Sequence, residues 1–225
     1  MGLSKKNIVA SIINKTFYKK PRIKNLRILS FSDLYSYLAK DEIDFIKTFL
    51  KINPRKFGFK GKYLGKSQVP RGLILIKNQK YKFGGETKII SGQYLLRKTY
   101  KIYKELNVAM KKEINKELLI TSAYRSPAYQ AIIFLYYLSL NNFNFKLTAK
   151  RVAFPCYSEH SDPKAQAVDF MAKSAALCGK GNDYFDKTEE YKWLLKNAGR
   201  FGLELSYSKR NTSGIMFEPW HWRAN

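Results

Sequence analysis

The spacing of apolar residues predicts helices in the first part of the chain. Residues 4–18 suit a short amphipathic helix, and residues 32–52 repeat apolar side chains at helical intervals. Pro54 ends the second pattern, and a Gly- and Lys-rich passage over residues 56–70 is typical of a loop. The chain before residue 71 is therefore expected to be helical and irregular.

Strands and helices alternate in the middle of the chain. Alternation across residues 71–82 indicates a strand or hairpin arm, and helical spacing runs over residues 93–113. Residues 118–122 form an apolar run that suits a strand. Ser126-Pro127 then begins a helix that is expected to continue to Leu140, because proline is favoured in the first helical turn.

The C-terminal part completes a mixed pattern. Thr188 is a typical helix cap, and residues 203–207 and 214–221 suit paired antiparallel strands. Helices gathered against a small antiparallel sheet give an α+β fold. We expect two parts: a basic N-terminal extension over residues 1–70 and a main domain over residues 71–225.

Length and cysteine content limit the possible classes of protein. A chain of 225 residues can bury a substantial core. Its two cysteines, Cys156 and Cys178, allow at most one disulfide and form no thiol metal motif. No apolar run approaches the roughly 18 residues of a membrane span. The apolar run after Lys6 is too short and too soon interrupted for a signal peptide, so export by that route is not expected.

The net charge of +25 needs a separate explanation. The first 32 residues contain eight Lys or Arg and no acid, and residues 1–66 hold sixteen basic against four acidic residues. Such a segment attracts polyanions, among them anionic wall polymers, acidic lipid surfaces and nucleic acid. The alternative is a solvated face in a chain that is rich in lysine throughout.

The two histidines of the chain both stand near carboxylates. His160 precedes Asp169 by nine positions, and His221 follows Glu218 by three. Catalytic zinc takes three protein ligands from imidazole and carboxylate groups and keeps one position for water. His160, Asp169 and His221 make such a set, and Glu218 is then a candidate general base. Because Pro219 separates Glu218 from His221 near the chain end, we expect an irregular, bulged strand end there rather than a helix.

These motifs resemble the VanY-type D-alanyl-D-alanine carboxypeptidases, zinc peptidases that trim bacterial cell-wall stem peptides. The family pattern is Tyr-Arg-Ser, then Ser-x-His, Ala-x-Asp and Glu-x-Trp-His. The chain carries it in this order as Ser122-Ala123-Tyr124-Arg125-Ser126, Ser158-Glu159-His160, Ala167-Val168-Asp169 and Glu218-Pro219-Trp220-His221. The resemblance covers roughly residues 85–225.

The resemblance implies an α+β fold with a Zn²⁺ site on the sheet and peptidoglycan stem peptides as substrates. It also implies that Arg125 positions the substrate and stabilises charge at the scissile bond, which its planar fork can do by binding oxygens bidentately. Ser158 and Gln130 match substrate-binding positions of the family, although either can instead support only the backbone.

Several positions depart from the family pattern. The separation of nine residues between His160 and Asp169 replaces the usual seven, and Gln166 stands where glycine is usual. Asp162 is an alternative carboxylate ligand. We favour Asp169, because the alternation around it places it on a strand facing the site. Cys156 could also compete for metal, but a small buried side chain is its expected role.

Two classes of function remain open from the sequence. The first is a zinc metallopeptidase that removes a terminal D-alanine, with a lysin-like endopeptidase as a second enzymatic reading. The second is a non-catalytic module that binds the wall or a polyanion. Specific nucleic-acid binding is not expected, because Trp220 and Trp222 bracket a candidate ligand instead of lining a basic groove. The family reading implies action at the wall, or a cytoplasmic protein until its release.

Overall fold

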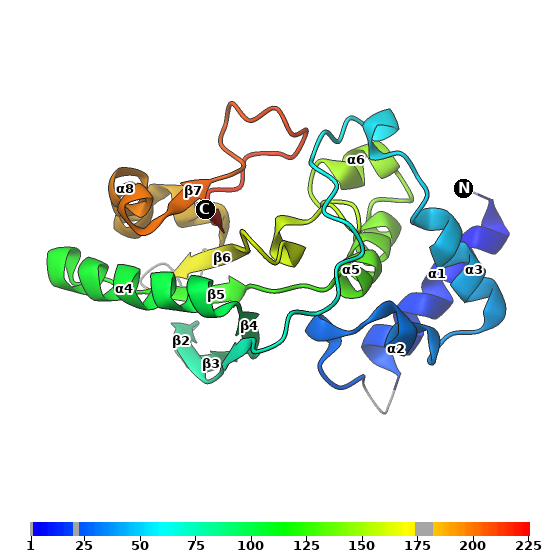
Figure 1. Ribbon diagram of the computed structural model, residues 1–225, viewed down its shortest axis with the longest axis horizontal. Helices are drawn as coiled ribbons and strands as arrows, with labels where there is room; N and C mark the ends of the chain where they lie inside the picture. Colours follow the sequence, from blue (N-terminus) through cyan, green and yellow to red (C-terminus); the bar gives the residue numbers. More distant parts are fainter. Residues whose placement is uncertain (1, 20–22, 174–181) are drawn as a thin grey trace. The chain divides into compact units, whose positions relative to one another are not determined.

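The computed structural model of this protein describes residues 2–19, 23–173 and 182–225 (Figure 1). The predicted α+β class is confirmed, with helices and small antiparallel sheets. The chain forms two compact units. Unit 1 comprises residues 1–69, 125–161 and 211–216, and unit 2 comprises residues 70–124, 162–210 and 217–225. The expected division into an N-terminal extension over residues 1–70 and a zinc carboxypeptidase-like catalytic domain over residues 71–225 stays a prediction.

Unit 1 is helical. Its helices are α1 (Leu3–Ile13), which continues as a π-helical segment (Asn14–Tyr18), α2 (Phe31–Tyr35), α3 (Lys40–Phe49), α5 (Pro127–Leu140) and α6 (Phe145–Ala149). Short 3₁₀ turns lie at Leu26–Ile28, Pro54–Phe57 and Glu159–Ser161. An aromatic cluster centred on Phe134 and Phe154, whose ring centroids are 4.3 Å apart, fills the core of the unit.

The single helix expected over residues 32–52 is divided in two. Ser30 and Asp33 cap each other at the start of α2, and the Ala39 N–H donates to Glu42 Oε2 at 2.7 Å at the start of α3. Ser11 Oγ of α1 and Lys15 Nζ of the π-helical segment after it donate to the same carboxylate at 2.6 and 2.7 Å. The break is thus fixed partly by contacts with α1.

Glu42 is expected to make a pH-dependent contribution to stability. Burial alone would raise the pKa of its carboxyl, but hydrogen bonds from Lys15, Ser11 and Ala39 outweigh burial and lower the pKa. The carboxylate therefore stabilises the fold above its unfolded pKa of about 4.3, and this contribution is lost as the pH falls through the lower folded pKa. Glu42→Gln should reduce the free energy of unfolding by about 2 kcal/mol at pH 7, measured by urea denaturation.

A matched variant separates this effect from a general loss of negative charge on α3. Asp44 is exposed and lies 4.0 Å from Lys47, so Asp44→Asn should change stability by less than about 0.5 kcal/mol. The difference between the wild type and Glu42→Gln should also shrink in acid, below about pH 4. A stability difference that stayed constant down to acidic pH would contradict the assignment.

Unit 2 contains the main sheet. Its four strands are antiparallel neighbours in the order β5 (Leu118–Ser122), β6 (Ala167–Ala172), β8 (His221–Ala224) and β7 (Leu203–Leu205). Two smaller antiparallel pairs join β1 (Ile74–Ile76) to β4 (Gln93–Leu95) and β2 (Gln79–Phe83) to β3 (Glu86–Ile90). Among its described residues, the helices of this unit are α4 (Arg97–Ile114) and α8 (Glu189–Asn197), with 3₁₀ turns at Asn182–Lys187 and Ala198–Phe201.

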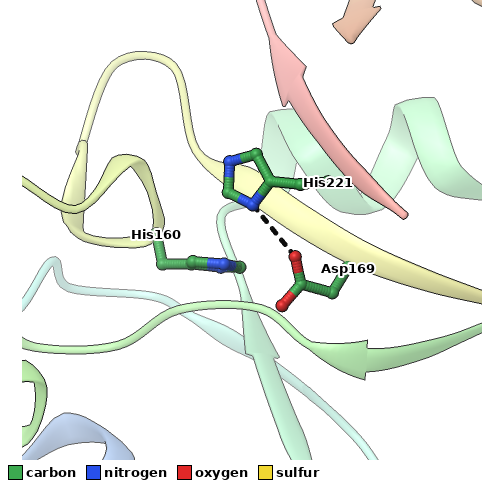
Figure 2. Close-up of side chains that lie close together, drawn as sticks. All are labelled: His160, Asp169 and His221. Carbon is green, nitrogen blue, oxygen red and sulfur yellow. Dashed lines mark hydrogen bonds and ion pairs between the residues drawn. The ribbon is translucent and has the colours of Figure 1, made fainter. Parts of the chain in front are cut away.

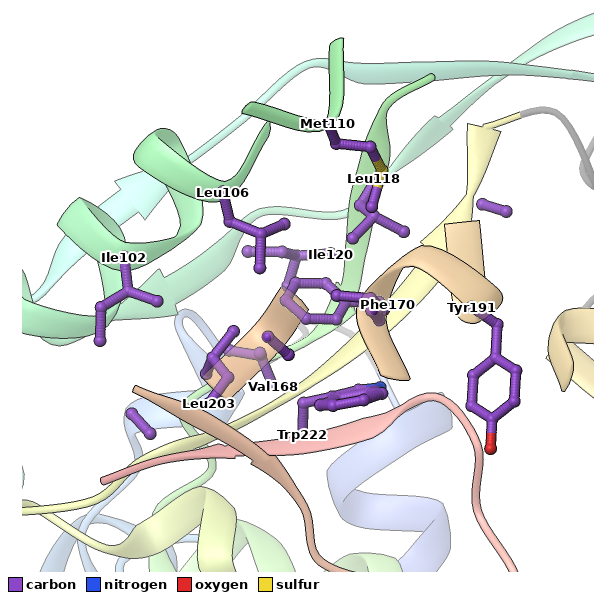
Figure 3. Close-up of a cluster of buried hydrophobic side chains, with 14 of the residues drawn as sticks. Ile102, Leu106, Met110, Leu118, Ile120, Val168, Phe170, Tyr191, Leu203 and Trp222 are labelled. Carbon is purple, nitrogen blue, oxygen red and sulfur yellow. The ribbon is translucent and has the colours of Figure 1, made fainter. Parts of the chain in front are cut away.

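The core of unit 2 lies between the sheet and its helices (Figure 3). Helix α4 presents Leu106 and Met110, four residues apart, to the buried face of β5 and β6. On that face Ile120 and Phe170 are paired across the two strands, and both are fully buried. This packing anchors the middle strands, from which the candidate site projects.

The local predictions for residues 71–225 hold except at several element boundaries. The strand at Leu118–Ser122, the helix to Leu140 and the Thr188 cap are confirmed. The helix expected over residues 93–113 begins only at Arg97, because Gln93–Leu95 pairs with β1 as a strand. The last strand begins at His221, so residues 214–220 lie outside it. Among the described residues, none of the helices combines the length and apolarity that a bilayer crossing requires.

Candidate metal centre

The register of the central strands places Asp169 beside His221. The two residues face each other across the antiparallel pair of β6 and β8. His221 Nδ1 lies 3.0 Å from Asp169 Oδ1 (Figure 2), and both residues are more than nine-tenths buried. The backbone carbonyl of Asp169 also accepts a hydrogen bond from Thr121 Oγ1 at 3.1 Å. The sheet therefore holds one imidazole and one carboxylate in a fixed arrangement.

A turn positions Glu218 next to His221. The His221 N–H donates to the Glu218 carbonyl at 3.1 Å, and the Glu218 N–H donates to the Tyr207 carbonyl at 3.0 Å. Glu218 Oε2 lies 3.9 Å from His221 Nδ1, and only 13% of the Glu218 side chain is exposed. In place of the expected bulged strand end, the structure has a hydrogen-bonded turn that contains Pro219. This turn brings the side chains of Glu218 and His221 close together.

Tyr207 contacts the site although the sequence reasoning did not select it. Its ring stacks on the His221 ring with centroids 4.5 Å apart and an interplanar angle of 28°. Together with the backbone contact to Glu218, this stacking limits rotation of the imidazole. No sequence pattern distinguishes Tyr207, which is one tyrosine among sixteen.

His160 lies on the 3₁₀ turn Glu159–Ser161 and is 3% exposed. Its carbonyl accepts a hydrogen bond from the Arg125 N–H at 3.2 Å. Ser161 Oγ donates to the Arg125 carbonyl at 2.6 Å, so two bonds hold this turn against the chain that leads into α5. The Ser161 N–H also donates to the Ser158 carbonyl at 2.8 Å and closes the turn.

Three side chains gather as a potential metal group. His160, Asp169 and His221 each offer one ligand atom, and these atoms lie within 4.8 Å of one another (Figure 2). A tetrahedral ion with bonds of about 2.0–2.2 Å holds its ligands roughly 3.4 Å apart, which small side-chain movements would reach here. Two imidazoles with one carboxylate is a donor set typical of catalytic zinc. The residues therefore fit the ion, and their assignment as ligands stays a prediction.

The alternative carboxylate, Asp162, is engaged elsewhere. Its Oδ1 accepts hydrogen bonds from the N–H groups of Lys164 and Ala165, and its Oδ2 lies 3.5 Å from Arg223 Nη2. Asp162 thus orders the loop that holds the two extra residues. This placement favours Asp169 as the carboxylate of the metal group.

Gln166, which stands where the family usually has glycine, fastens the start of β6. Its Oε1 accepts from the Leu96 N–H at 2.9 Å, and its Nε2 donates to the Tyr94 carbonyl at 3.1 Å. The side chain thereby joins β6 to the segment between β4 and α4. The substitution therefore has a structural role that residue spacing alone could not indicate.

Cys156 is a buried thiol outside the metal group. It is 3% exposed, and burial raises the pKa of its thiol to about 11. A protonated thiol is a poor metal ligand, since the thiolate is the form that binds metals. Cys178, the other member of the possible disulfide, lies outside the described residues.

The three predicted substrate-binding residues differ in burial. Gln130 is 1% exposed, and its Nε2 donates to the Ala153 carbonyl at 2.8 Å. Ser158 is 2% exposed and contributes its carbonyl to the turn that carries His160. Both contacts correspond to the backbone support left open as the alternative role. Arg125 is partly exposed, with its backbone bonded to the same turn. Substrate contacts by the three residues stay predictions.

Comparison with known proteins places these residues in a wider group. Residues 92–224 match the family model described as VanY: D-alanyl-D-alanine carboxypeptidase. YodJ of Bacillus subtilis (strain 168), a carboxypeptidase by name, is 28% identical over 174 residues, which are 69% of this chain and 61% of YodJ. A D-alanyl-D-alanine carboxypeptidase of Enterococcus faecium is 24% identical over 184 residues, which are 72% of this chain and 54% of that protein.

A solved structure supports the same placement. The LdcB LD-carboxypeptidase, whose structure is described in terms of peptidoglycan recognition, is 28% identical with a TM-score of 0.57. The match covers 76% of this chain and 78% of that chain. By contrast, the chain spans less than two thirds of the length of each of the two curated relatives.

Proposed function

The chain belongs to the D-alanyl-D-alanine carboxypeptidase family of VanY, a family of zinc metallopeptidases, and from this premise we propose that it hydrolyses a peptide bond in peptidoglycan stem peptides. The simplest reaction is removal of a terminal D-alanine. The observation that carries the proposal is the buried group of His160, Asp169 and His221 with Glu218 on the adjoining turn. A structural zinc site would not require a fourth, unliganded carboxylate beside one of its histidines.

His160, Asp169 and His221 would hold Zn²⁺ in this proposal. The ion, when bound, supplies a Lewis acid and lowers the pKa of water at its open position to about 7. The chain contributes the rigidity of the site, since the ligands come from paired strands and a doubly bonded turn. Burial of all three side chains strengthens their electrostatic interactions by excluding water.

Glu218 would act as the general base. Its carboxylate lies 3.9 Å from a ring nitrogen of His221, so it is next to the proposed ligands without being in the group of three. It would accept the proton of the attacking water and return it to the amine of the departing residue. The turn and the contact with Tyr207 fix its backbone before substrate arrives.

Arg125 would bind substrate oxygens. Its backbone is joined to the His160 turn, so a side chain leaving this point starts close to a proposed ligand. The guanidinium can bind a terminal carboxylate or the negative charge that develops on the scissile carbonyl. Ser158 and Gln130 would contribute mainly by keeping this segment rigid.

The function is tested with defined stem peptides. The full chain, loaded with zinc, is incubated with a stem tetrapeptide and a stem pentapeptide, and the products are analysed by mass spectrometry. We expect loss of one alanine from at least one peptide, and a chelator should prevent it because the ion is needed for hydrolysis. Both peptides are required, since similar proteins carry D-alanyl-D-alanine and LD-carboxypeptidase names.

The alternative activities give different products. A cut inside the peptide would identify an endopeptidase that uses the same residues. Cleavage that continues in the presence of chelator would contradict the zinc assignment. Intact peptides in every reaction would contradict the carboxypeptidase and favour a wall-binding module that holds zinc without turnover.

A further inference from the structure

Unit 2 carries a lysine-lined hollow at the C-terminal end of α4. The hollow has a volume of about 580 Å³ and lies between the hairpin β2–β3, the end of α4 and the start of β5. Its positive side chains are Lys80, Lys82, Lys111, Lys116 and Lys173. Two carboxylates, Glu117 and Glu190, also line it, so positive charge is in excess.

A second hollow continues along α4. It measures about 710 Å³, lies between α4 and the strands β1 and β5, and shares Lys111 and Glu117 with the first. It adds Lys104 and Lys112 from α4. We call the two hollows together the lysine groove. The two hollows have lining residues in common, and their described charged lining is mostly positive.

Ion pairs cancel only part of this charge. Lys116 Nζ lies 3.1 Å from Glu189 Oε2. Lys173 Nζ lies 2.5 Å from Glu117 Oε2, and Lys111 lies 4.0 Å from the other oxygen of that carboxylate. The hydrogen bond from Lys173 is the main reason why the pKa of Glu117 is lowered. Lys80, Lys82 and Lys112 are exposed and are not needed to neutralise Glu117. Their charges are therefore presented to solvent.

We propose that the lysine groove binds a linear anionic polymer of the cell wall whose repeating units are joined by phosphodiester groups. Lysine ammonium groups are flexible point charges that neutralise successive phosphates without demanding one fixed geometry. The polymer would release its counterions on binding, which favours association. The choice of a cell-wall polymer rests on the proposed function. The choice of an anionic ligand rests on the lysines of the groove.

Features of the groove favour this partner over nucleic acid or a membrane. Single-stranded nucleic acid is normally bound with exposed rings that stack on bases. Here the Tyr103 hydroxyl donates to the Leu118 carbonyl at 3.0 Å, and Tyr81 packs on Leu119 and Met171. The rings are thus used for internal packing. A concave lining is also poorly suited to a flat lipid surface.

The test measures binding of the full chain to a fluorescently labelled glycerol-phosphate oligomer by anisotropy at several salt concentrations. The variant Lys80→Gln/Lys82→Gln/Lys112→Gln should weaken binding by about tenfold or more at low salt and reduce its salt dependence. Its hydrolysis of a soluble stem peptide should be unchanged. Binding needs no hydrolysis, so failure of the proposed function would not affect this measurement.

A matched variant removes the same charge from exposed positions in unit 1: Lys5→Gln/Lys24→Gln/Lys51→Gln. This variant should retain most of the affinity. Equal losses of affinity in both variants would contradict the proposal and show that the overall charge of the protein drives binding. A larger loss of affinity in the second variant would assign binding to the basic N-terminal segment. Tighter binding to single-stranded DNA or to anionic vesicles, or no binding of the wild type to the oligomer, would also overturn the proposal.

Discussion

Replacing Glu218 with glutamine is expected to lower the rate of stem-peptide hydrolysis by about 10²–10⁴-fold while one zinc remains bound per chain. Glutamine has nearly the same shape, so the turn to His221 and the contact with Tyr207 should persist. It cannot accept a proton as a carboxylate does. The loss should therefore appear in kcat, because a general base acts in the chemical step.

The measurement pairs kcat and KM on a stem peptide with metal content determined by mass spectrometry of the purified chain. Glu204→Gln is a suitable control, since Glu204 is exposed on β7 and the substitution removes the same charge. The control should retain full activity. If Glu218→Gln hydrolysed the peptide at the wild-type rate with zinc in place, another group would have to be the base.

Loss of any one proposed ligand is expected to release the metal and abolish hydrolysis. His160→Ala, His221→Ala and Asp169→Asn would each leave two ligand side chains, which is too few to hold zinc in a catalytic site. Substitutions of groups that merely orient ligands usually cost 10–100-fold in metal affinity, so removal of a ligand should cost more than about 100-fold. Zinc content after dialysis and peptide hydrolysis measure the two effects.

Asp162→Asn distinguishes the two candidate carboxylates. Asp162 lies in a turn and beside Arg223, so this variant should keep zinc even if the loop is weakened. Circular dichroism of each variant separates loss of metal from loss of the fold. Zinc retained by Asp169→Asn and lost from Asp162→Asn would reverse the assignment.

The sequence predicted the residue types of the candidate site because their chemistry is local. Two histidines near carboxylates favour a metal site when they stand together with the other motifs, and the order of the motifs indicates the family. Helix starts with strong local signals were also predictable. Ser126 accepts from the Tyr129 N–H, and Thr188 accepts from the Tyr191 N–H, as their positions before helical patterns suggest.

Tertiary structure decided the features that depend on distant partners. The break between α2 and α3 involves Lys15 from the π-helical segment after α1, and the strand Gln93–Leu95 exists because β1 pairs with it. Helical periodicity continues through both places, and only the contact between Ala39 and Glu42 is local, so the spacing of apolar residues did not mark them. The Glu42 carboxylate and the backbone of residues 93–95 have hydrogen-bond partners far away in the sequence. The predicted helix boundaries at these two places were wrong for this reason.

The same division applies to the site. From sequence alone His160, Asp169, His221 and Glu218 could be selected, since their types and order are written in the chain. Only the pairing of β6 with β8 brings Asp169 within 3.0 Å of His221, and only packing places Tyr207 on the imidazole. Residue type determines which chemistry is possible. The register of strands determines which side chains meet, because a shift of one residue would turn Asp169 to the opposite face of the sheet.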